Sequence, residues 1–269
     1  MKGLKIVVLA KQVPDTRNVG KDAMKADGTV NRAALPAIFN PEDLNALEQA
    51  LRIKDKIEGT TVHILTMGPG RAAEIIREAM YRGADGGYLL SDRAFAGSDT
   101  LATSYALSCA LRNLEYDLII CGRQAIDGDT AQVGPQISEH LGLPVISYAQ
   151  KIREVNEAEK YIVVERQYDD RYHVVKAQLP CLLTALAELN EPRYMTPGGI
   201  FDAYAKEITV WGRKDLKEVE DSNLGLKGSP TQIAKASDKV RKGAGEKVEL
   251  DPAASADYIV GKLAEKHII

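Results

Sequence analysis

A loop rich in glycine and aspartate follows a short apolar strand near the middle of the chain. The stretch from Asp117 to Gly134 reads DLIICGRQAIDGDTAQVG, and an amphipathic helix is predicted to begin near Thr130. A helix N-terminus presents unpartnered backbone N–H groups and a partial positive charge, and glycine lets a phosphate approach the backbone closely. These residue types at this spacing could bind an anion. The alternative is an ordinary capping pair, because Gln132 follows Asp129 by three residues.

The other polar residues show no pattern typical of bond-breaking chemistry. The chain lacks a GxxxxGK[ST] loop for triphosphates, a GxGxxG turn after its first strand, and an SGGxD loop. None of the four histidines is placed with a serine or cysteine as a nucleophilic pair, and the three cysteines lack the paired spacing of a zinc site. We therefore expect a site without a metal that holds a nucleotide and does not cleave it.

Alternating strands and helices are predicted to position this loop. Apolar strands are expected at residues 5–9, 61–66, 87–90 and 118–120, each followed in the chain by a helix. This alternation predicts an α/β fold with a doubly wound parallel sheet and right-handed crossovers. Such sheets bind ligands at the carboxyl ends of their strands. Four strand ends should therefore face one crevice, namely Ala10, Met67, Ser91 and Gly122.

The pattern changes after the helix expected at residues 130–141. Residues 151–155, 161–166 and 172–177 alternate apolar and polar side chains, which predicts an added small antiparallel sheet. Beyond Asn190, prolines and glycines interrupt any regular element. Residues 216–251 are too polar to bury much apolar surface alone. We predict a nucleotide-binding domain over residues 1–200 and a C-terminal arm over 201–269, ending in a helix at 255–266.

Composition excludes several classes of partner. The 269 residues carry a formal net charge of −3, which does not predict a nucleic-acid-binding face. No apolar run approaches the ~20 residues that a membrane helix needs. We expect a protein of the cytoplasm that binds neither nucleic acid nor membrane.

Several short motifs, in their order and spacing, resemble one known family. The chain from Lys5 to about Phe201 is similar to the small (beta) subunit of electron transfer flavoproteins. The matching segments are VLAKQVP (8–14), Asn40-Pro41, Met67-Gly68-Pro69, RGAD (82–85), the stretch 122–134, VER (164–166), Leu179-Pro180 and NEPRY (190–194).

The resemblance implies a Rossmann-like fold of the adenine-nucleotide alpha-hydrolase type, working as a heterodimer with a large (alpha) subunit that carries FAD. Most small subunits of the family bury AMP, whereas electron-bifurcating members bind a second FAD that accepts hydride from NADH. The implied nucleotide contacts are Ala10, Asn40, Met67, Gly68, Gly122, Gln124, Asp127, Gly128, Asp129, Thr130, Ala131, Gln132, Val133 and Gly134. Residues 17–34 could help cover a flavin ring, although an exposed flap is the simpler interpretation.

The loop resembles the bifurcating version more closely than the AMP version. AMP-binding members carry a further acidic residue where Gly128 stands, and a bulkier run after it. Gly128 and Ala131 remove side chains where a pyrophosphate would pass, and Thr130 offers a hydroxyl and an N–H. We favour FAD, with NADH as donor and ferredoxin or flavodoxin as low-potential acceptor. A structural AMP remains the alternative, as does a nucleotide-sensing stress-type module from a different functional class.

The segment from Asn190 to Phe201 resembles the loop with which the family recognises acyl-CoA dehydrogenases. Family members place a leucine just after the threonine that matches Thr196, whereas this chain has Pro197. A linker to the arm is the alternative interpretation. The residues expected to contact a dehydrogenase are Glu191, Arg193, Tyr194, Thr196, Pro197, Ile200 and Phe201.

Overall fold

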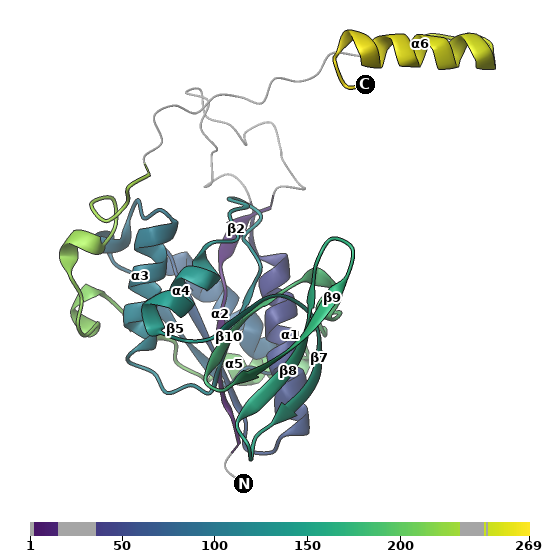
Figure 1. The fold of residues 1–269 in the computed structure, drawn as a ribbon. Helices are drawn as coiled ribbons and strands as arrows, with labels where there is room; N and C mark the ends of the chain where they lie inside the picture. Colours follow the sequence, from purple (N-terminus) through teal and green to yellow (C-terminus); the bar gives the residue numbers. More distant parts are fainter. Residues whose placement is uncertain (1–2, 16–35, 232–244, 246) are drawn as a thin grey trace. The chain divides into compact units, whose positions relative to one another are not determined.

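The computed structural model describes residues 3–15, 36–231, 245 and 247–269 (Figure 1). The chain divides into two compact units, residues 1–235 and 236–269, which are described separately. The predicted cover at residues 17–34 lies outside the described residues.

The first unit is built on one nine-stranded sheet with the order β11-β5-β4-β1-β6-β10-β7-β8-β9. The strands from β11 to β7 run parallel to their neighbours, and β8 and β9 continue antiparallel. The α/β class is thus confirmed. The bounds are β1 Lys5–Leu9, β4 Thr61–Met67, β5 Gly86–Leu90, β6 Leu118–Gly122, β7 Val145–Asn156, β8 Tyr161–Gln167, β9 Tyr172–Gln178, β10 Cys181–Ala185 and β11 Thr209–Trp211.

The predicted antiparallel strands are present, and they extend one edge of the central sheet. The reason is β7, whose twelve residues pair in parallel with β10 at one end and antiparallel with β8 along the rest. Register shifts after Ala149 and Ile152 bend the strand between these two pairings. A second sheet, apart from the central one, has two short strands, β2 Gln12–Pro14 and β3 Ala37–Phe39.

Helices cover both faces of the parallel strands, as the apolar run of β1 requires. Ile6 and Val8 point into a core shared with α1 (Pro41–Lys56) and α2 (Ala73–Arg82). Val7 and Leu9 point the other way, into a core shared with α3 (Thr100–Leu111) and α4 (Val133–Leu141). A strand buried on both faces is apolar at every position.

The strand order reverses direction at β1. The chain proceeds from β1 to β4 and β5 on one side, then returns to place β6 on the other side of β1. Loops that leave the carboxyl ends of β1 and β6 therefore part from each other and leave a crevice at this switch point.

The first unit continues well past residue 200. After a short turn at Ala187–Leu189, α5 (Pro197–Tyr204) packs on α2 and β11 joins the edge of the sheet. Leu216 and Leu224 are buried in the core beside α3, so this part of the polar segment packs within the first unit. Two isolated leucines in a polar stretch gave too weak a pattern to predict this packing.

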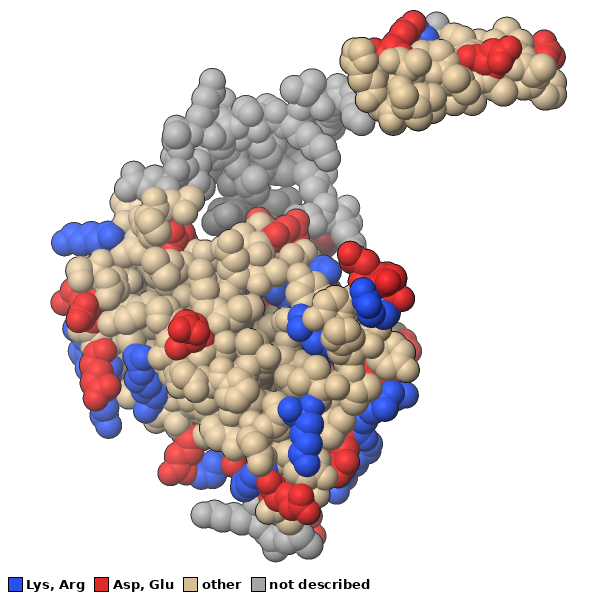
Figure 2. All heavy atoms as spheres, in the orientation of Figure 1, with Lys and Arg blue, Asp and Glu red and all other residues tan. Residues whose placement is uncertain are grey.

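The second unit contains α6 (Pro252–Glu265), which Asp251 caps by accepting the N–H groups of Ala253 and Ala254. Among the described residues, no helix is long and apolar enough to cross a membrane. Figure 2 shows acidic and basic side chains interspersed over the face in view, without a single basic patch.

Candidate functional site

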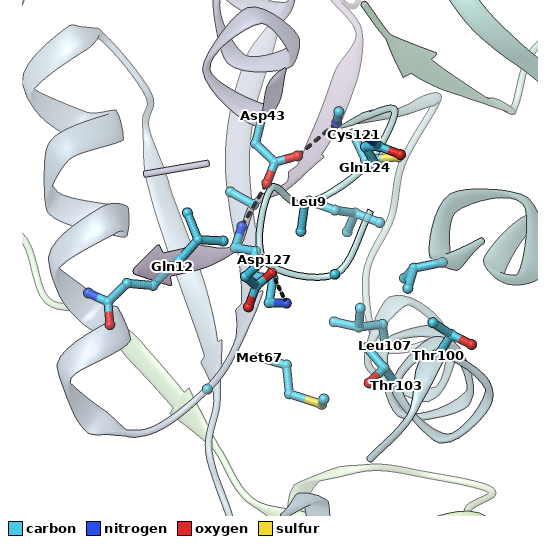
Figure 3. Close-up of a pocket in the computed structure, with 18 of the residues that line it drawn as sticks. Leu9, Gln12, Asp43, Met67, Thr100, Thr103, Leu107, Cys121, Gln124 and Asp127 are labelled. Carbon is cyan, nitrogen blue, oxygen red and sulfur yellow. Dashed lines mark hydrogen bonds and ion pairs between the residues drawn. The ribbon is translucent and has the colours of Figure 1, made fainter. Parts of the chain in front are cut away.

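A cavity of about 570 Å³ opens at the carboxyl ends of β1 and β6 (Figure 3). Its volume falls in the range of small-molecule sites. All but one of the predicted nucleotide contacts line it: Ala10, Met67, Gly68, Gly122, Gln124 and the seven residues from Gly128 to Gly134, together with Asp127. The structure thus brings together residues at and after the ends of three separate strands, β1, β4 and β6.

Asn40 is the exception, because this implied nucleotide contact does not line the cavity. Its side chain is fully buried, and both ends of the amide bind the backbone of residues 122–134, here called the cavity loop. The amide nitrogen donates to the carbonyl oxygen of Gln124 at 2.9 Å, and the amide oxygen accepts the N–H of Ile126 at 3.1 Å. Asn40 positions the loop and does not line the cavity.

Two acidic residues in the first turn of α1, Glu42 and Asp43, bind the same loop. A carboxylate oxygen of Glu42 accepts the N–H of Gln124 at 3.0 Å, and its other oxygen pairs with Arg123 at 2.9 Å. Asp43 accepts the N–H of Gly122 at 2.8 Å and the N–H of Lys11 at 2.9 Å. The first turn of α1 therefore holds residues 122–126 through their backbone.

Burial dominates the ionisation of this acidic group. It raises the pKa of Asp43 to about 7, although the N–H groups of Lys11 and Gly122 and the side chain of Asn40 oppose the shift. Burial also raises the pKa of Glu42. The pKa of the Cys121 thiol is raised for the same reason, so this cavity-lining sulfur is a neutral thiol.

The second half of the loop, residues 128–134, is held quite differently. Asp129 and Ala131 adopt left-handed φ angles of 48° and 53°, and α4 begins only at Val133. Its N-cap residue, Gln132, makes no side-chain cap, so the capping pair of Asp129 and Gln132 that the sequence allowed does not form. Within the described part of the chain, the N–H groups of Thr130, Ala131 and Gln132 have no hydrogen-bond partner.

These open N–H groups suit a negatively charged ligand. Successive N–H groups around a left-handed residue form a concave anion-binding surface, and the dipole of α4 adds to its attraction. The neighbouring helix α3 serves as a comparison, because Asp99 caps it by accepting the N–H groups of Leu101 and Ala102. The N-terminus of α3 is thus capped, whereas that of α4 is left open for an anion.

Two glycines of the loop have different functions. A Cβ atom on Gly128 would meet nothing within 4 Å, so its small size keeps space open in the cavity. A Cβ on Gly134 would lie 2.9 Å from Cys121 Sγ and 3.0 Å from Thr184 Cγ2. Gly134 therefore lets α4 pack closely on the sheet.

Sequence reasoning missed the wall opposite the loop. Thr100, Thr103 and Leu107 of α3 face the cavity, and Phe95 lines it nearby. It also missed Lys11, whose ammonium pairs with Asp127 at 2.7 Å. One sequence feature could have predicted the α3 residues: a helix with an N-cap residue follows the end of β5, at the same edge of the sheet.

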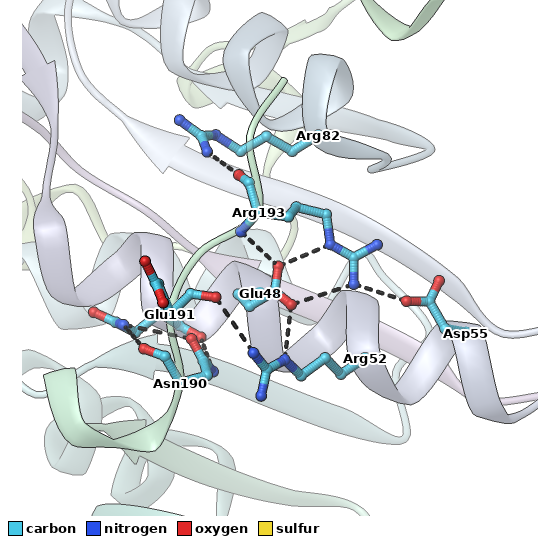
Figure 4. Close-up of polar contacts among 8 residues, drawn as sticks. Glu48, Arg52, Asp55, Arg82, Asn190, Glu191 and Arg193 are labelled. Atoms are coloured by element: carbon cyan, nitrogen blue, oxygen red, sulfur yellow. Dashed lines mark hydrogen bonds and ion pairs between the residues drawn. The ribbon is translucent and has the colours of Figure 1, made fainter. Parts of the chain in front are cut away.

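Asn190, Glu191 and Arg193, at the start of the segment 190–196, are hydrogen-bonded to the middle of α1 (Figure 4). Glu48 is buried and accepts hydrogen bonds from the backbone N–H and the guanidinium of Arg193, at 3.1 and 2.8 Å. Arg52 pairs with the same carboxylate at 2.8 Å, and Asp55 pairs with Arg193 at 2.7 Å. Burial opposes ionisation of Glu48, but the two arginines outweigh it and lower its pKa.

The predicted docking residues consequently divide into two groups. Arg193 points inward as an anchor, and the Glu191 carbonyl accepts a hydrogen bond from Arg52. Thr196 caps α5 by accepting the N–H of Gly199 at 3.0 Å, and Pro197 occupies the first helical position, which proline suits. Tyr194 and Phe201 are 90% and 77% exposed and face solvent, while Ile200 is half-buried.

No cluster of three or more histidine, cysteine, aspartate or glutamate residues suited to a metal ion occurs in the ranges that the structure describes. The cavity instead combines apolar walls, open backbone N–H groups and a few charged side chains. This arrangement can bind and orient a phosphate-bearing ligand, and its lining includes no nucleophile paired with a base.

Comparison with known proteins identifies relatives along nearly the whole chain. The electron transfer flavoprotein domain family matches residues 27–220. The electron transfer flavoprotein subunit beta of Clostridium acetobutylicum is 47% identical over 266 residues, covering 99% of this chain and 100% of the relative. The caffeyl-CoA reductase-Etf complex subunit CarD of Acetobacterium woodii is 48% identical, also over 99% and 100%. The acryloyl-CoA reductase electron transfer subunit gamma of Anaerotignum propionicum is 44% identical with the same coverage.

Proposed function

This chain belongs to the electron transfer flavoprotein family as a beta-type small subunit, and we propose that its cavity binds FAD. The observation that carries the proposal is the uncapped N-terminus of α4, which leaves the N–H groups of Thr130, Ala131 and Gln132 open beside the cavity. The family assignment removes the support for a nucleotide-sensing stress-type module.

The residues present fit the diphosphate of such a cofactor. Thr130, Ala131 and Gln132 offer backbone N–H groups, and Gly128 leaves free space next to them. The apolar wall of Leu107 and Phe95 offers a surface on which a flat aromatic ring can pack. AMP has only one phosphate and would leave part of this loop without a ligand.

When bound, FAD supplies hydride acceptance from NADH and electron transfer, to ferredoxin or flavodoxin and, through the large-subunit flavin, to an acyl-CoA dehydrogenase. The chain itself supplies orientation. Asn40, Glu42 and Asp43 fix the first half of the cavity loop, so the open half has a defined position relative to β1 and α3. Such preorganisation lowers the cost of binding. We propose electron bifurcation as the activity of the heterodimer.

Exposed aromatic residues on α5 and the segment before it support a protein-docking role. Tyr194, Phe201 and Tyr204 are all more than two-thirds exposed. Aromatic side chains in this number on one short stretch are typical of a protein interface. We propose that this surface contacts an acyl-CoA dehydrogenase. The names of two relatives, which belong to acyl-CoA reductase systems, support this kind of partner.

The second unit is proposed to pack on the large subunit. Helix α6 carries exposed apolar residues, including Ile259 and Val260, and none of its residues is buried within the chain as described. An amphipathic helix of this kind is suited to a groove on another protein.

Flavin content and reduction by NADH test the proposed function. The heterodimer, produced by co-expression with its large subunit, should contain one flavin more than the large subunit holds. NADH should reduce the flavin bound to this chain. A heterodimer that releases AMP and one flavin would support the non-bifurcating alternative. A second flavin that NADH does not reduce would contradict the assignment of NADH as donor.

A further inference from the structure

Asp43 joins the ends of two strands through a single carboxylate. One carboxylate oxygen accepts the N–H of Lys11, just past the end of β1, and the other accepts the N–H of Gly122, at the end of β6 (Figure 3). These strands are adjacent, and their loops part at this point. The carboxylate therefore bridges the switch point from which the cavity opens.

The geometry around this bridge is tight. A Cβ atom on Gly122 would lie 2.6 Å from Asp43 Oδ1, so glycine is needed for the carboxylate to reach the backbone. Asp43 is 6% exposed, and it lines the cavity. A shift of this side chain would move the start of the cavity loop.

The charge of Asp43 has no cationic partner among the described residues. The ammonium of Lys11 pairs with Asp127, and Arg123 pairs with Glu42. On the β6 side Asp43 faces the neutral thiol of Cys121, and on its own helix the neighbouring carboxyl group of Glu42 adds to the rise of its pKa. A buried carboxylate without a cation is costly, and its retention beside a cavity is typical of a functional group.

We infer that Asp43 is the positioning residue of the nucleotide site, and that its two hydrogen bonds to Lys11 and Gly122 set the shape of the loop that holds the phosphates. This inference rests on the proposed nucleotide function of the cavity.

The bridge depends on ionisation. A carboxylate accepts two N–H groups, whereas a carboxylic acid carries a proton on one of its oxygens and loses acceptor strength there. Its pKa of about 7 makes this change occur near neutral pH. Ligand affinity should therefore be highest above this pH and fall below it.

The test uses the full chain with FAD as the probe, whose pyrophosphate does not titrate near neutral pH. In the wild type, affinity should fall about tenfold between about pH 8 and about pH 6, the equivalent of one hydrogen bond. Asp43→Asn should bind about tenfold more weakly at the higher pH and show a flat profile, because asparagine resembles the protonated form.

Asp117 provides the matched control. It accepts the N–H of Lys5 at 2.9 Å and lies beside β1 at the opposite edge of the same two strands. Burial opposes its ionisation, but its hydrogen bonds with Lys160 and with the N–H of Lys5 lower its pKa, so it stays charged through this range. Asp117→Asn should retain the wild-type affinity and pH profile.

A second measurement needs no ligand. Amide hydrogen exchange at Lys11 and Gly122, corrected for its intrinsic pH dependence, should show less protection in Asp43→Asn, and in the wild type as pH falls through about 7. Equal protection in variant and wild type, or the same pH profile of FAD binding in both, would overturn the inference. A wild-type chain that binds neither FAD nor AMP would contradict the proposed function, while the exchange result would still decide whether Asp43 forms the bridge.

Discussion

Two buried acidic residues of one helix hold the two functional segments of this chain. Asp43, in the first turn of α1, binds the backbone of the cavity loop. Glu48, little more than one turn later, binds the segment that carries Tyr194. Burial opposes ionisation at both sites, yet the pKa of Asp43 is raised and that of Glu48 is lowered.

The difference lies in their partners. Arg52 and Arg193 pair with Glu48, whereas Asp43 has only uncharged donors. A carboxylate paired with two arginines remains charged at neutral pH and stabilises its segment. A carboxylate held by N–H groups alone can gain or lose its proton near neutral pH. We therefore expect the docking segment (residues 190–196) to be insensitive to physiological pH, and the cavity loop (residues 122–134) to respond to it.

The largest effect is expected at the cavity. Gly128→Asp places a carboxylate where the phosphates would pass, and two charges about 5 Å apart at an effective dielectric constant of about 20 repel by about 3 kcal/mol. FAD affinity should fall at least about 100-fold. Because a Cβ atom at Gly128 meets nothing within 4 Å, the fold should be retained. Flavin content and thermal unfolding of the heterodimer measure both effects.

Gly128→Ala is the matched control, since it adds a methyl group without charge and should retain most of the flavin. Full flavin content in Gly128→Asp would show that another residue distinguishes FAD from AMP.

The next effect concerns the docking segment. Glu48→Gln removes the charge that pairs with Arg52 and Arg193. Loss of one side of a buried ion pair costs several kcal/mol, but both arginines are partly exposed, so we expect about 2 kcal/mol. Urea unfolding measures this loss of stability.

Asp55→Asn is the control, because it breaks only the more exposed pair with Arg193 and should cost less than about 0.5 kcal/mol. Equal losses in the two variants would show that burial of Glu48 does not matter. Weaker FAD binding in Glu48→Gln would show that the two parts of α1 do not act independently.

A smaller effect is expected on the docking surface itself. Phe201→Ala removes an exposed aromatic side chain and should weaken dehydrogenase binding about tenfold, with flavin content unchanged. Val210→Ala on β11 changes another exposed apolar residue and should have no effect on binding. Titration of the heterodimer with the dehydrogenase measures the affinity, and an unaltered value for Phe201→Ala would argue against docking through α5.

The smallest expected effect is a difference in how the contributions of Asp43 and Glu48 to stability depend on pH. The folded-state pKa of Asp43 is raised to about 7, so its contribution to stability is present below its unfolded-state pKa and is lost as pH rises through about 7. The pKa of Glu48 is lowered, so its contribution is present above its unfolded-state pKa and is lost as pH falls through the folded value.

Relative to the wild type, Asp43→Asn should therefore gain about 1 kcal/mol of stability or more as pH rises from about 4 to about 8. Glu48→Gln should instead approach the wild type as the pH falls below about 4. Urea unfolding across this pH range measures both, and parallel curves for the two variants would remove the distinction between the two sites.

The sequence by itself determined the fold class and the place of the site. Apolar runs alternating with amphipathic helices are local patterns, and they predicted the parallel strands and the carboxyl-edge crevice because such strands must be covered on both faces. The stretch 122–134 and the NEPRY motif were also recognisable from residue types and spacing alone. Boundaries were less certain, as shown by α4, which begins at Val133 and not near Thr130.

Only the tertiary structure decided what the individual polar side chains do. Asn40 is as well suited to a base as to a backbone, and its burial against Gln124 settles which it binds. In the sequence Arg193 resembles a surface residue. In the structure it is anchored to Glu48, which lies 145 positions away in the chain. Partners so distant in the chain leave no local pattern. The pKa of a carboxylate depends on burial and on such partners together, and for that reason the opposite behaviour of Asp43 and Glu48 emerged only from the packed helix α1.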